Sequence, residues 1–218
     1  MGRIAPLLTP ERVGFIDFPL DSDGFIRRAY LGADPALGHP NGEGFRFSLA
    51  LRMAEAYLAE DGIGIDNGRQ DPTNMSFGQR ELFQIQPNTG GYVAMVPQGV
   101  QVLINVRSGP SPFQIVSMTD VIAGRVGEED IRDRVVLIGL TAISVKDLVN
   151  SAAVASDNPG LVNGVELHAH VVSQILSHVL DGRPMVRSWS DGWEYLWIVG
   201  LGHRGDTACP AAWIAPRL

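Results

Sequence analysis

The stretch that most constrains the fold is GVELHAHVVSQILSHVLDG, residues 164–182, because its residues repeat with the period of an α-helix. At 100° per residue the apolar side chains fall on one side of the helix and the polar side chains opposite. The apolar side holds Val165, His168, Ala169, Val172, Ile175, Leu176 and Val179, and the polar side holds Glu166, His170, Ser173, Gln174 and Ser177. Gly182 and Pro184 predict the end of the helix. A long helix with one apolar side must cover another layer of structure, so the sequence predicts a layered domain.

The second layer is predicted to be a β-sheet. The clearest strand is RVVLIG, residues 134–139, whose uninterrupted apolar run predicts a strand covered on both faces. Residues 13–31 predict a β-hairpin around the turn sequence DSDG, in which Gly24 can adopt a positive φ. Residues 92–97 and 100–107 predict two more strands.

Two further helices are expected between these strands. Residues 46–60 place Phe47, Leu51, Ala54 and Leu58 on one helical face, with Gly62 as a stop. The stretch FQIVSMTDVIAGRV predicts a short strand and then a helix capped by Ser117 or Thr119. We expect loops over 32–44, 63–80 and 140–163. The alternation predicts an α/β or α+β fold, with a mixed β-sheet and flanking helices.

Composition excludes several classes of protein. Apolar residues make up 45% of the 218 residues, which is enough for a core and argues against intrinsic disorder. The net charge of -7 argues against nucleic acid as a partner, because phosphate binding needs a basic surface. The one cysteine, Cys209, allows neither an internal disulfide nor a zinc cluster.

The stretch GLGHRG contains the G-x-G-x-x-G spacing of Gly200, Gly202 and Gly205. In a dinucleotide-binding fold these glycines join a strand to a helix, and an acidic residue follows about 20 positions later. Only 13 residues follow Gly205, and they include Pro210 and Pro216. We therefore interpret YLWIVGLG as the start of an apolar helix and expect no nucleotide cofactor.

Other polar clusters are ambiguous. His168 and His170 are two residues apart on a helix, so they point about 200° apart and do not share a metal ion. His168 is either a core histidine that bonds nearby backbone or a residue that contacts a ligand. Lys146 and Asp147 follow the predicted strand 134–139, where ligands bind in open α/β sheets, although an ordinary loop ion pair also explains them. A soluble α/β enzyme using Lys146, Asp147 and His168 is therefore the alternative hypothesis.

Six blocks in this order resemble the type 2 CHASE domain, the extracellular sensory domain of bacterial cyclases, histidine kinases and serine/threonine kinases. They are DSDGFIRR, FSLALRMAEAYL, VLINVR, FQIVSMTDVIAGRV, DRVVLIGLTAISVKD and NGVELHAHVVSQIL. The pattern carries over at Asp23, Gly24, Arg27, Gly139, Asp147, Gly164, Val165, Glu166, His168 and Ala169. The resemblance implies a module that binds a small molecule and does not catalyse a reaction, on the extracytoplasmic side of the membrane. We predict Arg27, Lys146, Asp147, Glu166 and His168 as ligand-binding residues, with no catalytic residue, metal or cofactor.

The chain departs from the family pattern in three places. His170 stands where the family usually has asparagine, and no Thr-Pro pair follows Asp147. The family also has a membrane helix and a β/α segment before the DSDG hairpin, so we expect the sheet to be incomplete at its N-terminus.

These departures and the resemblance together give a domain organisation. We predict a sensory domain at 1–190, the start of a truncated transmembrane helix at 191–202 and an unstructured, frameshifted tail at 203–218. In the intact protein the resemblance implies attachment through membrane helices and a homodimer. A degraded product without function is a third hypothesis.

Overall fold

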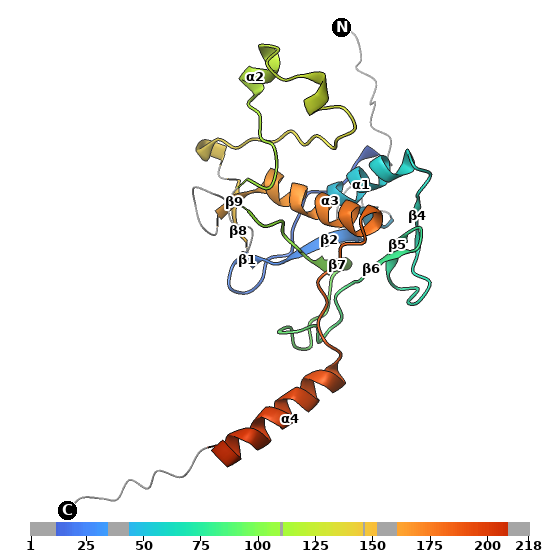
Figure 1. The fold of residues 1–218 in the computed structure, drawn as a ribbon, viewed down its shortest axis with the longest axis vertical. Coiled ribbons are helices and arrows are strands. Elements are labelled where there is room, and N and C mark those ends of the chain that lie inside the picture. Colours follow the sequence, from blue (N-terminus) through green and yellow to red (C-terminus); the bar gives the residue numbers. More distant parts are fainter. Residues whose placement is uncertain (1–11, 35–43, 110, 146, 152–160, 209–218) are drawn as a thin grey trace, which may run out of the picture. The chain divides into compact units, whose positions relative to one another are not determined.

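The computed structural model describes residues 12–34, 44–109, 111–145, 147–151 and 161–208 (Figure 1). The chain divides into two units, one of residues 1–85 and 97–186 and the other of residues 86–96 and 187–218. In the described part, the first unit contains all nine strands and the helices α1, α2 and α3. The predicted mixed α/β class is confirmed by helices together with mixed and antiparallel sheets.

The central sheet has the order β3-β2-β7 and is antiparallel. Its strands are β3 (Arg46–Phe47), β2 (Arg28–Ala33) and β7 (Val100–Leu103). The register between β2 and β7 shifts between Tyr30 and Gly32. A Cβ at Gly32 would clash with the Phe45 ring, so glycine at the bulge lets that ring lie against the strand without moving.

Two further three-stranded sheets complete the set in the described residues. The sheet β1-β8-β9 joins Phe25–Ile26, Leu148–Ser151 and Leu161–Asn163, with β1 parallel to β8. The sheet β4-β5-β6 is an antiparallel meander of Ile65–Asn67, Met75–Phe77 and Arg80–Leu82.

Helices α1 (Leu49–Ala59) and α3 (Gly164–Leu180) pack against each other, as Figure 1 shows. Ser48 caps α1 by accepting a hydrogen bond from the Leu51 amide, which places the start of the helix three residues after the predicted one. The core between the helices and strands includes Leu31, Leu51, Leu58, Phe77, Leu82, Val102, Val171 and Ile175. These side chains come from both helices and from the strands β2, β5, β6 and β7, so one core unites them.

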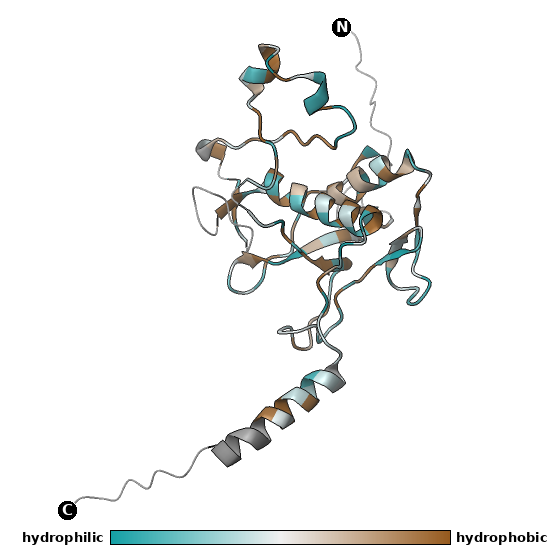
Figure 2. Ribbon diagram, in the orientation of Figure 1, coloured by the Kyte–Doolittle hydropathy of each residue, from teal (hydrophilic) through white to brown (hydrophobic). Residues whose placement is uncertain are grey.

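The predicted strand at 134–139 is wrong. Among the described residues no strand pairs with this segment, and its backbone carries no ladder hydrogen bonds. Only one face is covered, because Val135 packs on the core while Val136 and Ile138 are 51% and 85% exposed. Figure 2 shows the segment between α2 and β8 as a hydrophobic strip. An apolar run specifies a tendency to be buried, but it does not supply the partner strand that a ladder requires.

Other strand predictions need correction too. The DSDG turn forms, with Gly24 at φ 80°, but β1 pairs in parallel with β8 instead of closing a hairpin. Residues 92–97 form no strand, and Val93 and Val96 are exposed. The expected strand before α2 (Met118–Ile122) is absent from the described residues, although Ser117 caps α2 as predicted.

Two predicted loops contain strands instead. The stretch 63–80 holds β4 and β5, and its short polar strands show little apolar alternation. The stretch 140–163 holds β8 and β9, while Lys146 and residues 152–160 lie outside the described residues. Of the expected loop 32–44, β2 takes the first two residues, and residues 35–43 lie outside the described part.

Helix α3 forms at the predicted place, and Gly182 follows it at φ 71°. The polar side of α3 does not face solvent, because His170, Gln174 and Ser177 are all buried. The side chains of His170 and Gln174 bond backbone groups of residues 103–107, and the Ser177 hydroxyl donates to carbonyls of its own helix, so the polar side packs against protein.

The second unit contains α4 (Asp191–Ala208). Gly200, Gly202 and Gly205 lie inside this helix, so GLGHRG is not the turn between a strand and a helix that a nucleotide site needs. The helix also extends past Gly202 into the predicted tail, and residues 209–218 lie outside the described part. In the described part of the chain, no helix is both long and apolar enough to cross a membrane.

Candidate functional site

The first turn of α3 is built on two close backbone approaches. A Cβ at Gly139 would lie 2.5 Å from the Cβ of Val165, and a Cβ at Gly164 would lie 2.6 Å from a carboxylate oxygen of Asp147. The Gly164 amide donates to the Asp147 carbonyl at 3.1 Å. The Asp147 carboxylate therefore lies at the N-terminus of α3, where the helix dipole stabilises a negative charge.

His168 lies one turn further along α3 and is 8% exposed. Its ring packs on Phe18 at a centroid distance of 4.6 Å and hydrogen-bonds the backbone of Ile16. Burial lowers the pKa of His168, against the opposing effects of the Ile16 bond and the Asp147 charge. The buried Nδ1 has no hydrogen-bond partner among the described residues. These contacts fit the interpretation of a neutral core histidine that bonds nearby backbone, while a ligand contact stays a prediction.

Glu166 belongs to the same first turn of α3. Burial raises the pKa of its carboxyl group, because desolvation disfavours the charged form. Of the predicted ligand-binding residues, Asp147, Glu166 and His168 thus lie on or next to the first two turns of α3. Lys146 lies outside the described residues, and among those described no group of three metal-ligating side chains comes together.

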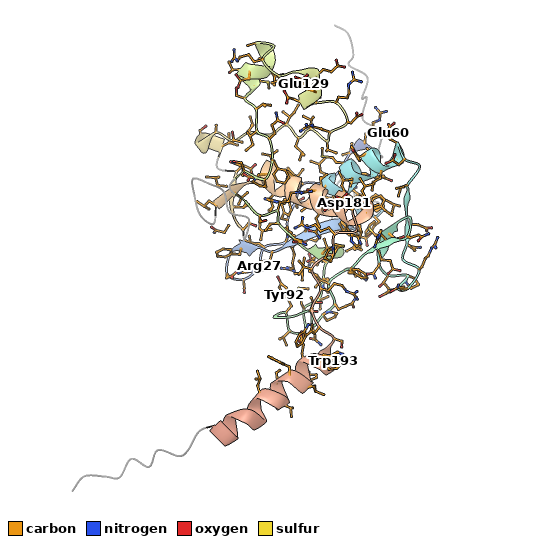
Figure 3. The ribbon with its side chains drawn as sticks, viewed as in Figure 1. Arg27, Glu60, Tyr92, Glu129, Asp181 and Trp193 are labelled. Carbon is orange, nitrogen blue, oxygen red and sulfur yellow. The ribbon has the colours of Figure 1, made fainter. Side chains whose placement is uncertain are left out.

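Arg27 is engaged within its own turn, beside β1 (Figure 3). Its guanidinium pairs with Asp21 at 2.9 Å and with Asp23 at 2.8 Å. The hydrogen bond from Arg27 lowers the pKa of Asp23 to about 2, and the two carboxylates raise the pKa of Arg27. Asp21 also pairs with the buried Arg28 at 2.6 Å. The ion pairs of Asp21 and Asp23 with Arg27 and Arg28 therefore hold the DSDG turn against the start of β2, and we call this group of four residues the charge clamp.

A hollow of about 460 Å³ was not predicted from the sequence. It is lined by Phe45, Phe47, Ile65, Asp66, Asn67, Thr73, Asn74, Met75 and Val100. Two of its polar groups already have partners, since Asn74 donates to Glu81 and Thr73 donates to Asp71. Gly78, at φ 59°, forms the two-residue turn that joins β5, which supplies Met75 to the lining, to β6.

The buried polar side of α3 forms a second group that sequence reasoning missed. Gln174 bonds the chain after β7 twice, accepting from the Asn105 amide at 2.6 Å and donating to the Leu103 carbonyl at 2.9 Å. His170 accepts from the Arg107 amide at 3.1 Å. Near the end of α3, the His178 ring contacts the Glu81 and Arg183 carbonyls at 3.0 and 2.8 Å. The helix therefore takes the place of a neighbouring strand for residues 103–107.

These features define a mixed α/β domain whose C-terminal long helix is joined to a sheet by buried polar side chains. The chain matches the family model of the CHASE2 domain over residues 3–205, so it belongs to the CHASE2 domain family. CHASE2 is an extracellular, sensory and non-catalytic domain family of signalling proteins. No curated protein and no solved structure matches the chain.

The packing at the start of α3 gives a structural role to Gly139 and Gly164, two residues of the predicted family pattern. Both glycines permit the close packing of backbone and side chains at the start of α3. The enzyme hypothesis required Lys146, Asp147 and His168 to converge on one pocket, and it is weakened by the non-catalytic character of the family. The described contacts of Asp147 and His168 serve to build the end of the helix.

Proposed function

We propose that this chain is the extracytoplasmic ligand-sensing domain of a bacterial membrane signalling protein with a cyclase or kinase output domain. The observation that carries the proposal is the CHASE2 match over residues 3–205. In this proposal the chain binds a small molecule and works in the intact receptor as a homodimer attached to the membrane. It needs neither a cofactor nor nucleic acid.

The sensing element is proposed to be α3, because two groups of polar residues lie on or next to it. One is the set of predicted ligand-binding residues at its start, and the other is the set of buried polar side chains that bond residues 103–107. Asp147, Glu166 and His168 lie at its N-terminal end, and its C-terminal end leads toward Arg183 and the second unit. A ligand changes the output only by binding two arrangements of the domain with different affinity. A contact that shifts α3 relative to residues 103–107 would provide such a difference, because Gln174 and His170 bond that segment directly.

The experiment is a fusion of this chain to the membrane helices and catalytic domain of an adenylate cyclase. Cyclic AMP is measured in whole cells with a panel of small organic acids, amines and sugars in the medium. At least one compound is expected to change the output two-fold or more, and Glu166→Gln and Asp147→Asn are expected to reduce that response. Glu129→Gln, in the exposed turn Glu128–Asp130, is the matched control. An output that is unchanged across the panel and by complete removal of the domain would contradict a sensory role.

A further inference from the structure

Arg107 lies shortly after the end of β7, and one edge of its guanidinium group is hydrogen-bonded to α3. Its backbone amide donates to Nδ1 of His170, and its side-chain Nε donates to the Ser173 hydroxyl. Neither terminal Nη atom has a hydrogen-bond partner among the described residues. The guanidinium is therefore oriented by α3, and its two Nη atoms still offer their N–H donors.

Arg183 reaches the same region from the segment that follows α3. Its Nη2 donates to the Asn105 side-chain oxygen at 2.9 Å and to the Val106 carbonyl at 3.0 Å. The side-chain amide of Asn105 in turn donates to the Pro184 carbonyl at 3.0 Å. These three bonds tie the exit of α3 to the end of β7 and fix the position of the second guanidinium.

The two positive charges are not balanced by acidic side chains in the described part of the chain. Arg27, Arg28, Arg52, Arg125 and Arg132 all form ion pairs, whereas Arg107 and Arg183 form none. Burial lowers the pKa of His170 to about 4, and repulsion from both Arg107 and Arg183 contributes to that shift. Both guanidiniums therefore lie near this ring, and no carboxylate of the described residues pairs with them there.

His170 adds a neutral donor to this pair. Because Nδ1 accepts from the Arg107 amide, the proton of the neutral ring is on Nε2. The residue is 2% exposed, and among the described residues its Nε2–H finds no nitrogen or oxygen acceptor. The Nε2–H is therefore available to donate to an added acceptor at this place.

We propose that Arg107, Arg183, His170 and Ser173 form a binding site for a small oxyanion, a phosphate or a dicarboxylate. The planar fork of arginine fits both chemistries, because each presents paired oxygens that accept two parallel hydrogen bonds. The Ser173 hydroxyl accepts from Arg107 and keeps its own hydrogen for the anion. A dianion matches the two arginine charges.

Such an anion would bridge the end of β7 and the segment leaving α3, the two parts that Arg107 and Arg183 come from. Its role as a signal rests on the proposed sensory function, but its binding does not. The site lies on the polar side of α3, whereas the ligand-binding residues predicted from the family pattern lie near the N-terminus of that helix. An anion bound at this site would therefore contact the domain toward the C-terminal end of α3.

The test titrates the purified chain with sodium phosphate and, separately, sodium malonate at pH 7.5, with ionic strength held constant by sodium chloride. Heat of binding and thermal unfolding are both recorded. At least one anion is expected to bind saturably and raise the Tm, and the tighter of the two identifies the chemistry. Arg107→Gln is expected to weaken that binding about tenfold or more, because it removes two charge-assisted hydrogen bonds.

Arg69→Gln is the matched control, since it removes the same charge from the exposed loop between β4 and β5. Ser173→Ala is a second variant that keeps both arginines and is expected to weaken binding by a smaller factor. The proposal is overturned if neither anion binds saturably, or if Arg69→Gln weakens binding as much as Arg107→Gln. If the anion binds but does not change the cyclase output of the fusion, the proposed site is supported and its sensory role is contradicted. Output that responds to other compounds, with no anion binding, would contradict only the site.

Discussion

The Gln174 side chain makes hydrogen bonds to the backbone at Asn105 that a neighbouring β-strand would otherwise make. Its side-chain amide accepts from the Asn105 backbone amide at 2.6 Å and donates to the Leu103 carbonyl at 2.9 Å, which is the pattern of two neighbouring ladder bonds. Because Gln174 is 2% exposed, water cannot replace these bonds. One helix side chain thus extends the order of β7 past its last ladder residue.

Replacing Gln174 with alanine should therefore destabilise the domain strongly. The change leaves the partly buried Asn105 amide and Leu103 carbonyl without these partners, at a cost of about 1–3 kcal/mol in the free energy of unfolding. Urea unfolding followed by circular dichroism measures the change. Gln79→Ala, at an exposed position in the turn between β5 and β6, should change the same free energy by less than about 0.5 kcal/mol. Equal effects of the two substitutions would contradict the strand-substitute role.

His170 should make the domain less stable in mild acid. Its pKa is about 4 in the folded chain, below the value of about 6.5 expected when unfolded. The unfolded state therefore binds a proton first as pH falls, and stability decreases from about pH 6.5 to about pH 4. Below that range the loss from this residue is complete, at about 3 kcal/mol.

His170→Asn tests this assignment because asparagine cannot titrate and can still accept from the Arg107 amide. The slope of unfolding free energy against pH between 4 and 6.5 should be smaller in this variant than in the original chain. His168, whose pKa is also lowered by burial, remains in both proteins and contributes equally. An unchanged slope would show that His170 is not the titrating group.

The helical part of the fold could be predicted because its signals are local. Gly62, Ser117 and Gly182 mark helix ends as predicted from capping and positive φ, whereas Ser48 caps α1, which begins three residues after its predicted start. Strands were predicted less well, since pairing depends on partners distant in the chain. The apolar run after Arg134 predicted a covered strand, yet no partner strand lies beside it among the described residues.

The polar groups of the candidate sites were harder still to predict. A helical wheel separates apolar from polar residues, but it treats the polar side as the solvent side. His170 and Gln174 lie on that side and are buried because residues 103–107 need hydrogen-bond partners. Nothing local in the sequence indicates this need, which arises where β7 ends. Asp147, Glu166 and His168 stay predictions, which rest on the family pattern and, for Asp147, also on its place after the predicted strand.

Gly139→Ala should destabilise the start of α3. The added Cβ would lie 2.5 Å from the Cβ of Val165, a branched side chain with little freedom to move. The expected cost is about 1–3 kcal/mol in the free energy of unfolding, by overpacking. Removing the Val165 side chain, including its Cβ, in the double variant Gly139→Ala with Val165→Gly should restore part of the loss, which a double-mutant cycle measures. Additive effects of the two substitutions would show that these residues do not meet.

The charge clamp in the DSDG turn predicts a separate loss of stability in strong acid. Asp23 has its pKa lowered to about 2 by its hydrogen bonds with Arg27, below the value of about 3.9 expected when unfolded. Its contribution is therefore complete above about pH 4 and disappears as pH falls toward 2. Asp23→Asn should flatten the urea midpoint between pH 4 and pH 2, while the exposed Asp61→Asn serves as the control. Because Asp23 is exposed, added salt should reduce the difference in midpoint between the original chain and Asp23→Asn at pH 5. A midpoint that falls as steeply in Asp23→Asn as in the original chain would place the acid-sensitive group elsewhere.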